Sequence, residues 1–224
     1  MSTGPIRAAY LGFGVLGAAV LGAFVYERAF PPQPAPALTR AGETPAAAKI
    51  EAGTVPAHRP DFTLKDLDGH AKSISAWDGK PLIINFWATW CAPCRREIPL
   101  LNRIQREYAP HGFEVVGIAV DFVDDVKAYK KTFPIDYPLL VGEDDGLEAA
   151  RAFGVQAMAF PFTAFTDTAG RLLLVHMGEL HEDQARAILG VVAEVDGGRL
   201  APAAARGAIE RALAALPGSA KAAE

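Results

Sequence analysis

The sequence predicts an α/β domain in which helices flank a central mixed β-sheet. Between residues 60 and 196, short apolar runs typical of buried strands alternate with longer stretches of helical period. The alternation closes with a hairpin, so antiparallel strands join the parallel ones. A Cys-x-x-Cys pair directly follows the first long buried run. These three observations define both the fold class and the place of the candidate site.

The elements can be followed in order along the domain. Short strands on either side of Asp68-Gly69 predict an N-terminal β-hairpin at 62–74. The run LIINFW at 82–87 is nearly continuous in apolar residues, as in a strand buried on both faces. The other predicted elements are helices at 93–108, 123–133, 146–153 and 181–195, and strands at 113–120, 138–141, 162–166 and 172–177.

Further regions flank this domain on both sides. Residues 8–26 carry no charge and, as a helix, would reach roughly 28 Å, close to the hydrocarbon thickness of a bilayer. We therefore expect a transmembrane anchor at 1–29, a Pro/Ala-rich linker at 30–59 and the folded domain at 60–196. Residues 197–224 form an Ala-rich C-terminal extension whose pattern allows one more helix at 202–216.

The N-terminal apolar segment has two alternative interpretations. A cleavable signal peptide has a shorter apolar region of about 7–15 residues, and the nearest small-residue tripeptide, at 35–37, is distant and contains proline. A buried helix would be separated from any core by the Pro-rich stretch. Arg7 precedes the segment, whereas Glu27 and Arg28 after it cancel, so the positive-inside rule places the N-terminus in the cytoplasm.

Composition and charge narrow the function. The formal net charge of -4 does not favour nucleic acid as a partner, because such proteins usually carry a basic field. The chain has 2 cysteines, Cys91 and Cys94. A disulfide that closes so short a loop constrains the unfolded chain little, so the pair is a poor structural staple. Its spacing indicates reversible redox chemistry instead.

The position of the cysteine pair predicts a different chemical role for each of the two thiols. Cys91 comes after a buried strand and at the start of a helix, where free N–H groups and the helix dipole favour a thiolate. Cys94 lies one turn further and deeper, so we expect Cys91 to be the nucleophile and Cys94 the resolving thiol. Pro93 fits the first helical turn, where its missing N–H costs nothing. No cofactor or metal is expected, since structural zinc requires about four ligands.

The segment INFWATWCAPCRREIP resembles the active-site segment of TlpA/ResA-like thiol–disulfide oxidoreductases. These are membrane-anchored, extracytoplasmic proteins of bacteria. The resemblance covers about residues 60–195, including the hairpin at 61–74 and a central helix–strand insertion at 123–141. It implies a thioredoxin fold and a single-pass protein of the bacterial inner membrane. The catalytic domain would then lie in the periplasm or otherwise outside the cytoplasm.

The resemblance also implies roles for residues beyond the cysteines. Glu97 matches an acidic residue that helps proton transfer at the resolving thiol. Pro161 matches a cis-proline that faces the dithiol and, with Trp90 and Phe160, would bind the substrate. Phe160 departs from the family, in which smaller or β-branched residues are frequent at this position.

Asn85 supports the site in a different way. It lies where thioredoxin itself has a buried aspartate, and an amide cannot take a proton. Glu97 is therefore the better candidate for the general base. The alternative for Glu97 is a solvated carboxylate on the helix. Pro99 matches a proline that would kink this helix.

Three functions are compatible with these residues. Family members reduce disulfides in apocytochrome c or in copper-site precursors of respiratory oxidases, with electrons from a transmembrane thiol donor of the DsbD/CcdA type. The reverse reaction, a dithiol oxidase, depends on the reduction potential, which the Ala-Pro dipeptide does not determine. A copper metallochaperone that holds Cu(I) through two thiolates is the third possibility.

Overall fold

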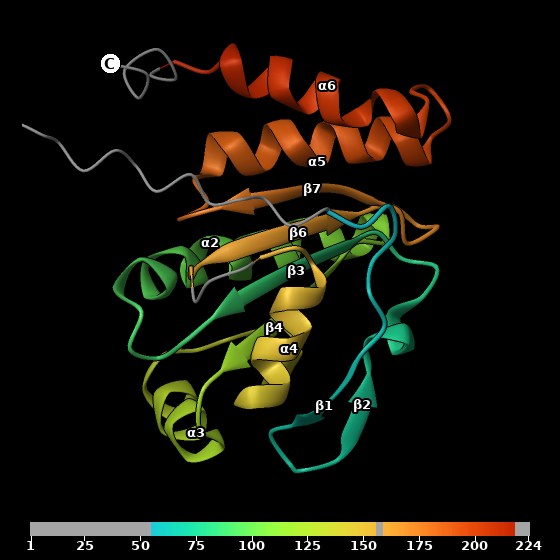
Figure 1. The fold of residues 1–224 in the computed structure, drawn as a ribbon. Helices are drawn as coiled ribbons and strands as arrows, with labels where there is room; N and C mark the ends of the chain where they lie inside the picture. Colours follow the sequence, from blue (N-terminus) through green and yellow to red (C-terminus); the bar gives the residue numbers. More distant parts are fainter. Residues whose placement is uncertain (1–54, 156–158, 218–224) are drawn as a thin grey trace, which may run out of the picture. The chain divides into compact units, whose positions relative to one another are not determined.

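The described chain forms an α/β domain with one mixed sheet, which confirms the predicted fold class (Figure 1). The computed structural model describes residues 55–155 and 159–217. The strands are β1 (Thr63–Asp66), β2 (Ala71–Ser73), β3 (Leu82–Trp87), β4 (Glu114–Val120), β5 (Leu139–Gly142), β6 (Phe162–Thr166) and β7 (Leu172–Met177). The helices are α2 (Ala92–Tyr108), α3 (Val123–Thr132), α4 (Asp144–Ala152), α5 (Glu182–Asp196) and α6 (Pro202–Ala214), with 3-10 turns η1 (Ile74–Trp77) and η2 (Ala109–His111).

The sheet has the order β2-β1-β5-β4-β3-β6-β7. Its centre is parallel, because β4 pairs in parallel with both β3 and β5. Antiparallel pairs complete each side, β1 with β5 and β6 with β3. The predicted strands therefore occur in a mixed sheet, and β3 lies near its middle.

Two apolar cores form on the two faces of this sheet. Residues of α2, α5 and α6 pack on one face, and residues of α4 pack on the other (Figure 1). Strand β3 contributes to both, since successive side chains alternate between faces. Ile83 and Trp87 belong to the α2 side, and Ile84 and Phe86 to the α4 side. All six residues of β3 are buried, as its apolar run predicts.

The element boundaries differ from the predicted ones by small amounts. Helix α4 begins at Asp144, two residues before the predicted start. Asp144 and Asp145 occupy its first turn, where negative charge is favourable to the helix dipole. Helix α2 continues through Pro99 to Tyr108.

The Ala-rich extension contains the helix that its pattern allows. Helix α6 packs in the α2-side core, where Ala205 and Ile209 are fully buried. It ends at Ala214 rather than 216. This segment thus adds apolar burial to the face that carries α2 and α5.

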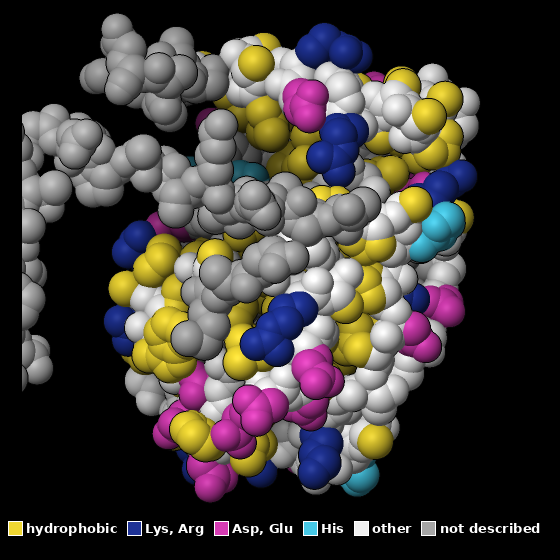
Figure 2. Space-filling view, in the orientation of Figure 1, with side chains coloured by type: hydrophobic (Ala, Val, Ile, Leu, Met, Phe, Trp, Pro, Cys, Tyr) yellow, Lys and Arg dark blue, Asp and Glu magenta, His cyan; other side chains and the backbone are white. Residues whose placement is uncertain are grey.

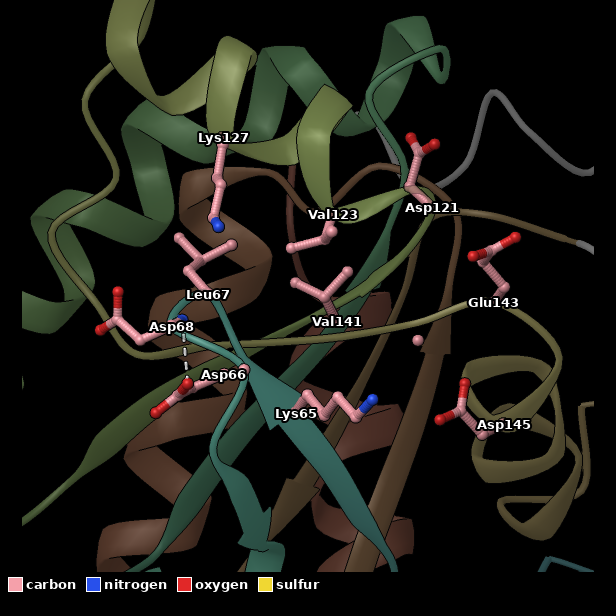
Figure 3. A pocket seen from close by; sticks show the side chains of 12 residues that line it. Lys65, Asp66, Leu67, Asp68, Asp121, Val123, Lys127, Val141, Glu143 and Asp145 are labelled. Atoms are coloured by element: carbon pink, nitrogen blue, oxygen red, sulfur yellow. Dashed lines mark hydrogen bonds between the residues drawn. The ribbon is translucent and has the colours of Figure 1, made fainter.

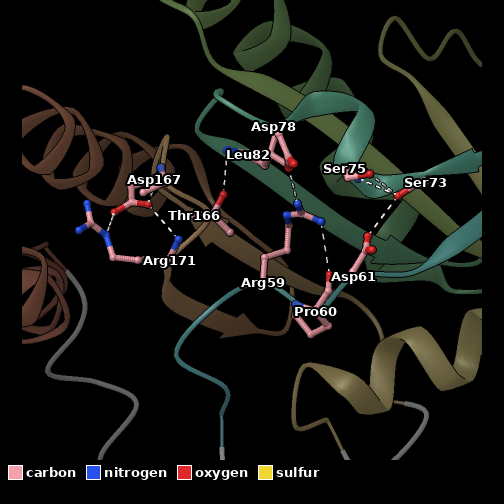
Figure 4. Close-up of polar contacts among 11 residues, drawn as sticks. Arg59, Pro60, Asp61, Ser73, Ser75, Asp78, Leu82, Thr166, Asp167 and Arg171 are labelled. Atoms are coloured by element: carbon pink, nitrogen blue, oxygen red, sulfur yellow. Dashed lines mark hydrogen bonds and ion pairs between the residues drawn. The ribbon is translucent and has the colours of Figure 1, made fainter.

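The end of the predicted linker is attached to the sheet. The N–H of Arg59 donates to the carbonyl of Gly170 at 2.8 Å, and the N–H of Leu172 donates to the carbonyl of Ala57 at 3.0 Å. Arg59 also contacts Asp78, its Nη2 lying 2.6 Å from Oδ1 (Figure 4). The chain therefore enters the domain beside the turn between β6 and β7, at the end of the sheet where β3 begins.

The expected anchor at 1–29 and the linker up to residue 54 lie outside the described residues. Within 55–155 and 159–217, no helix combines the length and the apolar character needed to cross a membrane.

Candidate redox site

The two cysteines lie where β3 has ended and α2 begins. Cys91 is the N-cap residue of α2, and its Sγ accepts the N–H of Cys94 at 3.3 Å. The two form a disulfide with a Cα–Cα distance of 5.3 Å. Cys91 is 5% exposed and Cys94 is 0% exposed. Cys91 is thus the more accessible sulfur, and it lies at the positive end of the helix dipole. Pro93 lies in the first turn, as predicted.

The loop that carries Cys91 is tied to the neighbouring strand. Asp121 directly follows β4, and its Oδ2 accepts both the N–H of Thr89, at 2.8 Å, and the hydroxyl of Thr89, at 2.6 Å. Its Oδ1 accepts the N–H of Phe122 at 2.9 Å. Sequence reasoning missed Asp121. The available signal was an aspartate immediately after a strand predicted to lie beside β3.

Aromatic side chains border the disulfide. Trp90 is 60% exposed, and its ring centroid lies 6.2 Å from that of Phe160. The Phe160–Pro161 peptide bond is cis, as the resemblance implies. Phe122 is exposed as well and follows Asp121. Figure 2 shows hydrophobic side chains gathered at this edge of the sheet, near the start of α2. The surface next to Cys91 is therefore largely apolar.

Glu97 is buried, so its interpretation as a solvated helix carboxylate is wrong. It is 1% exposed and follows Cys94 by one turn of α2, on the same face. Its Oε1 accepts from Asn85 Nδ2 at 2.7 Å, and its Oε2 accepts the N–H of Leu180 at 2.8 Å. Asn85 Nδ2 also donates to the hydroxyl of Thr163 at 3.0 Å. Asn85 thus holds the carboxyl group in place, whereas Thr163 and Leu180 were not predicted.

The environment of Glu97 changes its proton affinity. Burial raises the pKa of Glu97 from 4.5 to about 7, and the nearby charge of Glu179 adds to this rise. The hydrogen bonds from Leu180 and Asn85 act in the opposite direction, because they stabilise the carboxylate. A carboxyl group with this pKa can both take up and release a proton near neutral pH.

A separate hollow opens beside the site, with a volume of about 380 Å³. Figure 3 shows that it lies between β1, β5 and the segment after β4, with acidic and basic side chains around it. Asp121 reaches its lining, but neither cysteine does. The hollow is therefore distinct from the disulfide.

A disulfide at the start of a helix, preceded by a buried strand and set in this sheet, defines a thioredoxin-like thiol–disulfide oxidoreductase. Comparison with known proteins places the chain more closely. The model of the AhpC/TSA family matches residues 55–175, more than half of the chain, so the chain belongs to this family. The TlpA/ResA-type resemblance is also confirmed by its relatives.

Individual relatives agree with this assignment. The thioredoxin-like protein YneN of Bacillus subtilis (strain 168) is 34% identical over 127 residues, which cover 54% of this chain and 70% of YneN. The thiol-disulfide oxidoreductase ResA of Bacillus thuringiensis subsp. konkukian (strain 97-27) is 30% identical over 126 residues, with coverage of 56% and 70%. A solved structure described as a putative thiol:disulfide interchange protein DsbE from Chlorobium tepidum is 28% identical, with a TM-score of 0.54 over 61% of this chain and 94% of that one.

Proposed function

We propose that this oxidoreductase works as a protein disulfide reductase. The observation that carries the proposal is the arrangement of Cys91 at the start of α2, a less exposed Cys94 and a buried carboxyl group one turn beyond it. This arrangement provides a nucleophile, a resolving thiol and a proton acceptor in sequence along one helix.

The reaction starts from the reduced dithiol. The thiolate of Cys91 attacks one sulfur of the partner's disulfide, and the other sulfur leaves as a thiolate, so a mixed disulfide forms. Glu97 takes the proton of Cys94, whose thiolate then attacks Sγ of Cys91. The Cys91–Cys94 disulfide forms, and the partner leaves with both sulfurs reduced. Two electrons have passed to the partner, and a thiol donor must supply two more for the next cycle.

The substrate is proposed to reach Cys91 across the apolar surface formed by Trp90, Phe160 and Pro161. The exposure of Trp90 and its closeness to Phe160 support this route. The resemblance to the TlpA/ResA family supports apocytochrome c or oxidase-assembly proteins as substrates. It likewise supports a transmembrane thiol protein of the DsbD/CcdA type as electron donor.

We place this domain outside the cytoplasm of a bacterium, on an inner-membrane anchor at 1–29 followed by the linker at 30–59. The uncharged segment at 8–26 and the flanking charges support this placement. Extraction of membranes at alkaline pH tests it: release of the full-length protein into the soluble fraction would contradict an integral anchor.

The direct test of the mechanism is to trap the mixed disulfide. In Cys94→Ser the resolving step is removed, so we expect protein adducts at Cys91 that disappear on treatment with dithiothreitol. Cys91→Ser is the matched control and should yield none. If membranes of cells that express Cys94→Ser contain no such adduct, the substrate model fails.

The direction of electron flow is tested by titration against glutathione. A reductase should have a reduction potential more negative than about -200 mV, closer to thioredoxin than to the strong oxidant DsbA. A value near -120 mV, roughly that of DsbA, would instead identify a dithiol oxidase.

A further inference from the structure

One short loop between β7 and α5 contacts the redox site at three points. The N–H of Gly178 donates to the carbonyl of Pro161 at 2.9 Å. The N–H of Leu180 donates to Glu97 Oε2 at 2.8 Å. Between them, the carboxylate of Glu179 forms a bidentate ion pair with Arg96 on α2. Three consecutive residues therefore connect the cis-proline segment, the cysteine helix and the buried carboxyl group.

The ion pair of Arg96 with Glu179 lies at the solvent-exposed side of these contacts. The side chain of Arg96 is 61% exposed, so it is solvated over most of its surface. However, the side chain of Glu179 is only 20% exposed. Its charge lies close enough to Glu97 to act on it. Arg96 thus neutralises a half-buried charge next to the site.

We propose that Arg96 and Glu179 are positioning residues of the redox site. Their ion pair holds the loop 178–180 so that Leu180 donates to Glu97, and it limits the negative charge that Glu97 experiences. The pair would thereby set how readily Glu97 accepts the proton of Cys94. This inference rests on the proposed role of Glu97 as proton acceptor.

Among the groups around Glu97, Glu179 is the one whose negative charge raises its pKa, and Arg96 balances that charge. Asn85 and Thr163 are neutral hydrogen-bonding groups. Burial keeps Tyr137 protonated, because it raises the pKa of this phenol well above its usual value. Burial lowers the pKa of His176, so its ring stays neutral to a lower pH than that of an exposed histidine. Among the described residues, the titratable and charged groups around Glu97 and the loop are Cys94, Arg96, Tyr137, His176, Glu179 and His181.

The backbone conformation of the loop at Gly178 requires glycine. Gly178 has φ of +90°, in the left-handed region that favours glycine. A β-carbon there would meet no atom within 4 Å, so the space is open and the requirement is conformational. The contact from Gly178 to Pro161 thus depends on glycine for its backbone conformation, whereas the contact to α2 depends on charge.

The test compares two charge-neutralising variants in the full-length protein. Arg96→Gln leaves the charge of Glu179 unbalanced and loosens the loop, so we expect the proton affinity of Glu97 to rise about threefold to tenfold. Glu179→Gln removes that charge and keeps a neutral hydrogen-bond acceptor for Arg96, so the affinity should fall by about threefold. The measurement is the pH titration of the Glu97 carboxyl carbon by NMR, in both redox states, together with the pH dependence of the reduction potential.

The opposite signs are the decisive feature. General loosening of the structure would shift both variants in the same direction, and that result, or no shift in either, overturns the proposal. Arg96→Lys keeps the charge and should restore most of the wild-type titration. The matched control is the ion pair of Arg103 on α2 with Glu182 on α5, whose side chains are 45% and 49% exposed. Arg103→Gln and Glu182→Gln should leave the Glu97 titration unchanged, and equal shifts there would also overturn it.

A failure of the proposed role of Glu97 as proton acceptor can be distinguished from a failure of this inference. If Glu97 is not the proton acceptor, Glu97→Gln keeps the wild-type pH dependence of the reduction potential. The NMR titration of Glu97 in the Arg96 and Glu179 variants still reports whether the ion pair controls this carboxyl group.

Discussion

The side chains of β3 have different surroundings on the two faces of the sheet. On the α4 face, β3 contributes Phe86, which packs among phenylalanines: its ring centroid lies 4.4 Å from that of Phe162 and 5.4 Å from that of Phe153. On the α2 face, the adjacent residue Asn85 holds the carboxyl group of Glu97. One face is an apolar cluster, and the other encloses polar groups beside a disulfide.

The difference shows how a buried carboxyl group can be tolerated. Burying a polar group is costly unless it is hydrogen-bonded, and both oxygens of Glu97 accept a hydrogen bond. The remaining cost appears as a raised pKa, which is also what the proposed chemistry requires. We therefore expect mutations on the α4 face to change stability alone and mutations on the α2 face to change its dependence on pH.

The largest effect should come from the aromatic face. Phe153→Ala removes a fully buried ring that packs against Phe62, Phe86 and Phe162, so we expect a loss of about 3–5 kcal/mol in the free energy of unfolding. Urea denaturation measures this loss. The reduction potential of the folded variant should not change.

A control for that variant is Phe133→Ala, because Phe133 is 52% exposed. It should cost less than about 1 kcal/mol. A changed reduction potential in Phe153→Ala would show that the two faces are not independent.

The next effect concerns pH. The pKa of Glu97 is raised in the folded protein, so the folded state binds more protons than the unfolded state between about 4.5 and about 7. The contribution of Glu97 to stability is then fully present below this window and is lost as the pH rises through it, a loss of about 3 kcal/mol. In Glu97→Gln the titrating group is absent, so we expect this fall to disappear.

Urea unfolding of the oxidised protein at several pH values from 4.5 to 7.5 tests the expectation. Glu148→Gln, at an exposed position on α4, is the control and should keep the wild-type slope. An unchanged slope in Glu97→Gln would mean that Glu97 titrates in the folded protein as it does when unfolded.

A smaller effect is expected at the loop that carries Cys91. Asp121→Asn replaces one carboxylate oxygen by an NH₂ group, which leaves either Thr89 or Phe122 without one acceptor. We expect a loss of about 1–2 kcal/mol and slower reduction of a partner disulfide, because the loop before Cys91 is less firmly held. Asp124→Asn, an exposed position three residues later, should change stability by less than about 0.5 kcal/mol. Wild-type rates in Asp121→Asn would show that the loop keeps its position without this carboxylate.

Local patterns predicted the fold better than the site. The apolar run of β3 and the helical period after Cys94 depend on neighbours in sequence, so their elements were found with small errors. Thr163, Leu180 and Asp121 meet the site only because β6, the loop before α5 and the end of β4 converge on it. Such contacts between distant segments leave no period or spacing in the chain. Glu97 came from resemblance, but its burial depends on the same convergence.

The attachment of residues 57–59 to the turn between β6 and β7 has a consequence for reach. That turn lies at the end of the sheet where β3 begins, whereas the disulfide lies beyond the end of β3. The 6 residues of β3 separate the two by roughly 17 Å or more. Residues 57–59 therefore contact the sheet at one end of β3, and the disulfide lies beyond the other end. A partner that approaches Cys91 therefore does not compete for space with residues 57–59, because the length of β3 separates them.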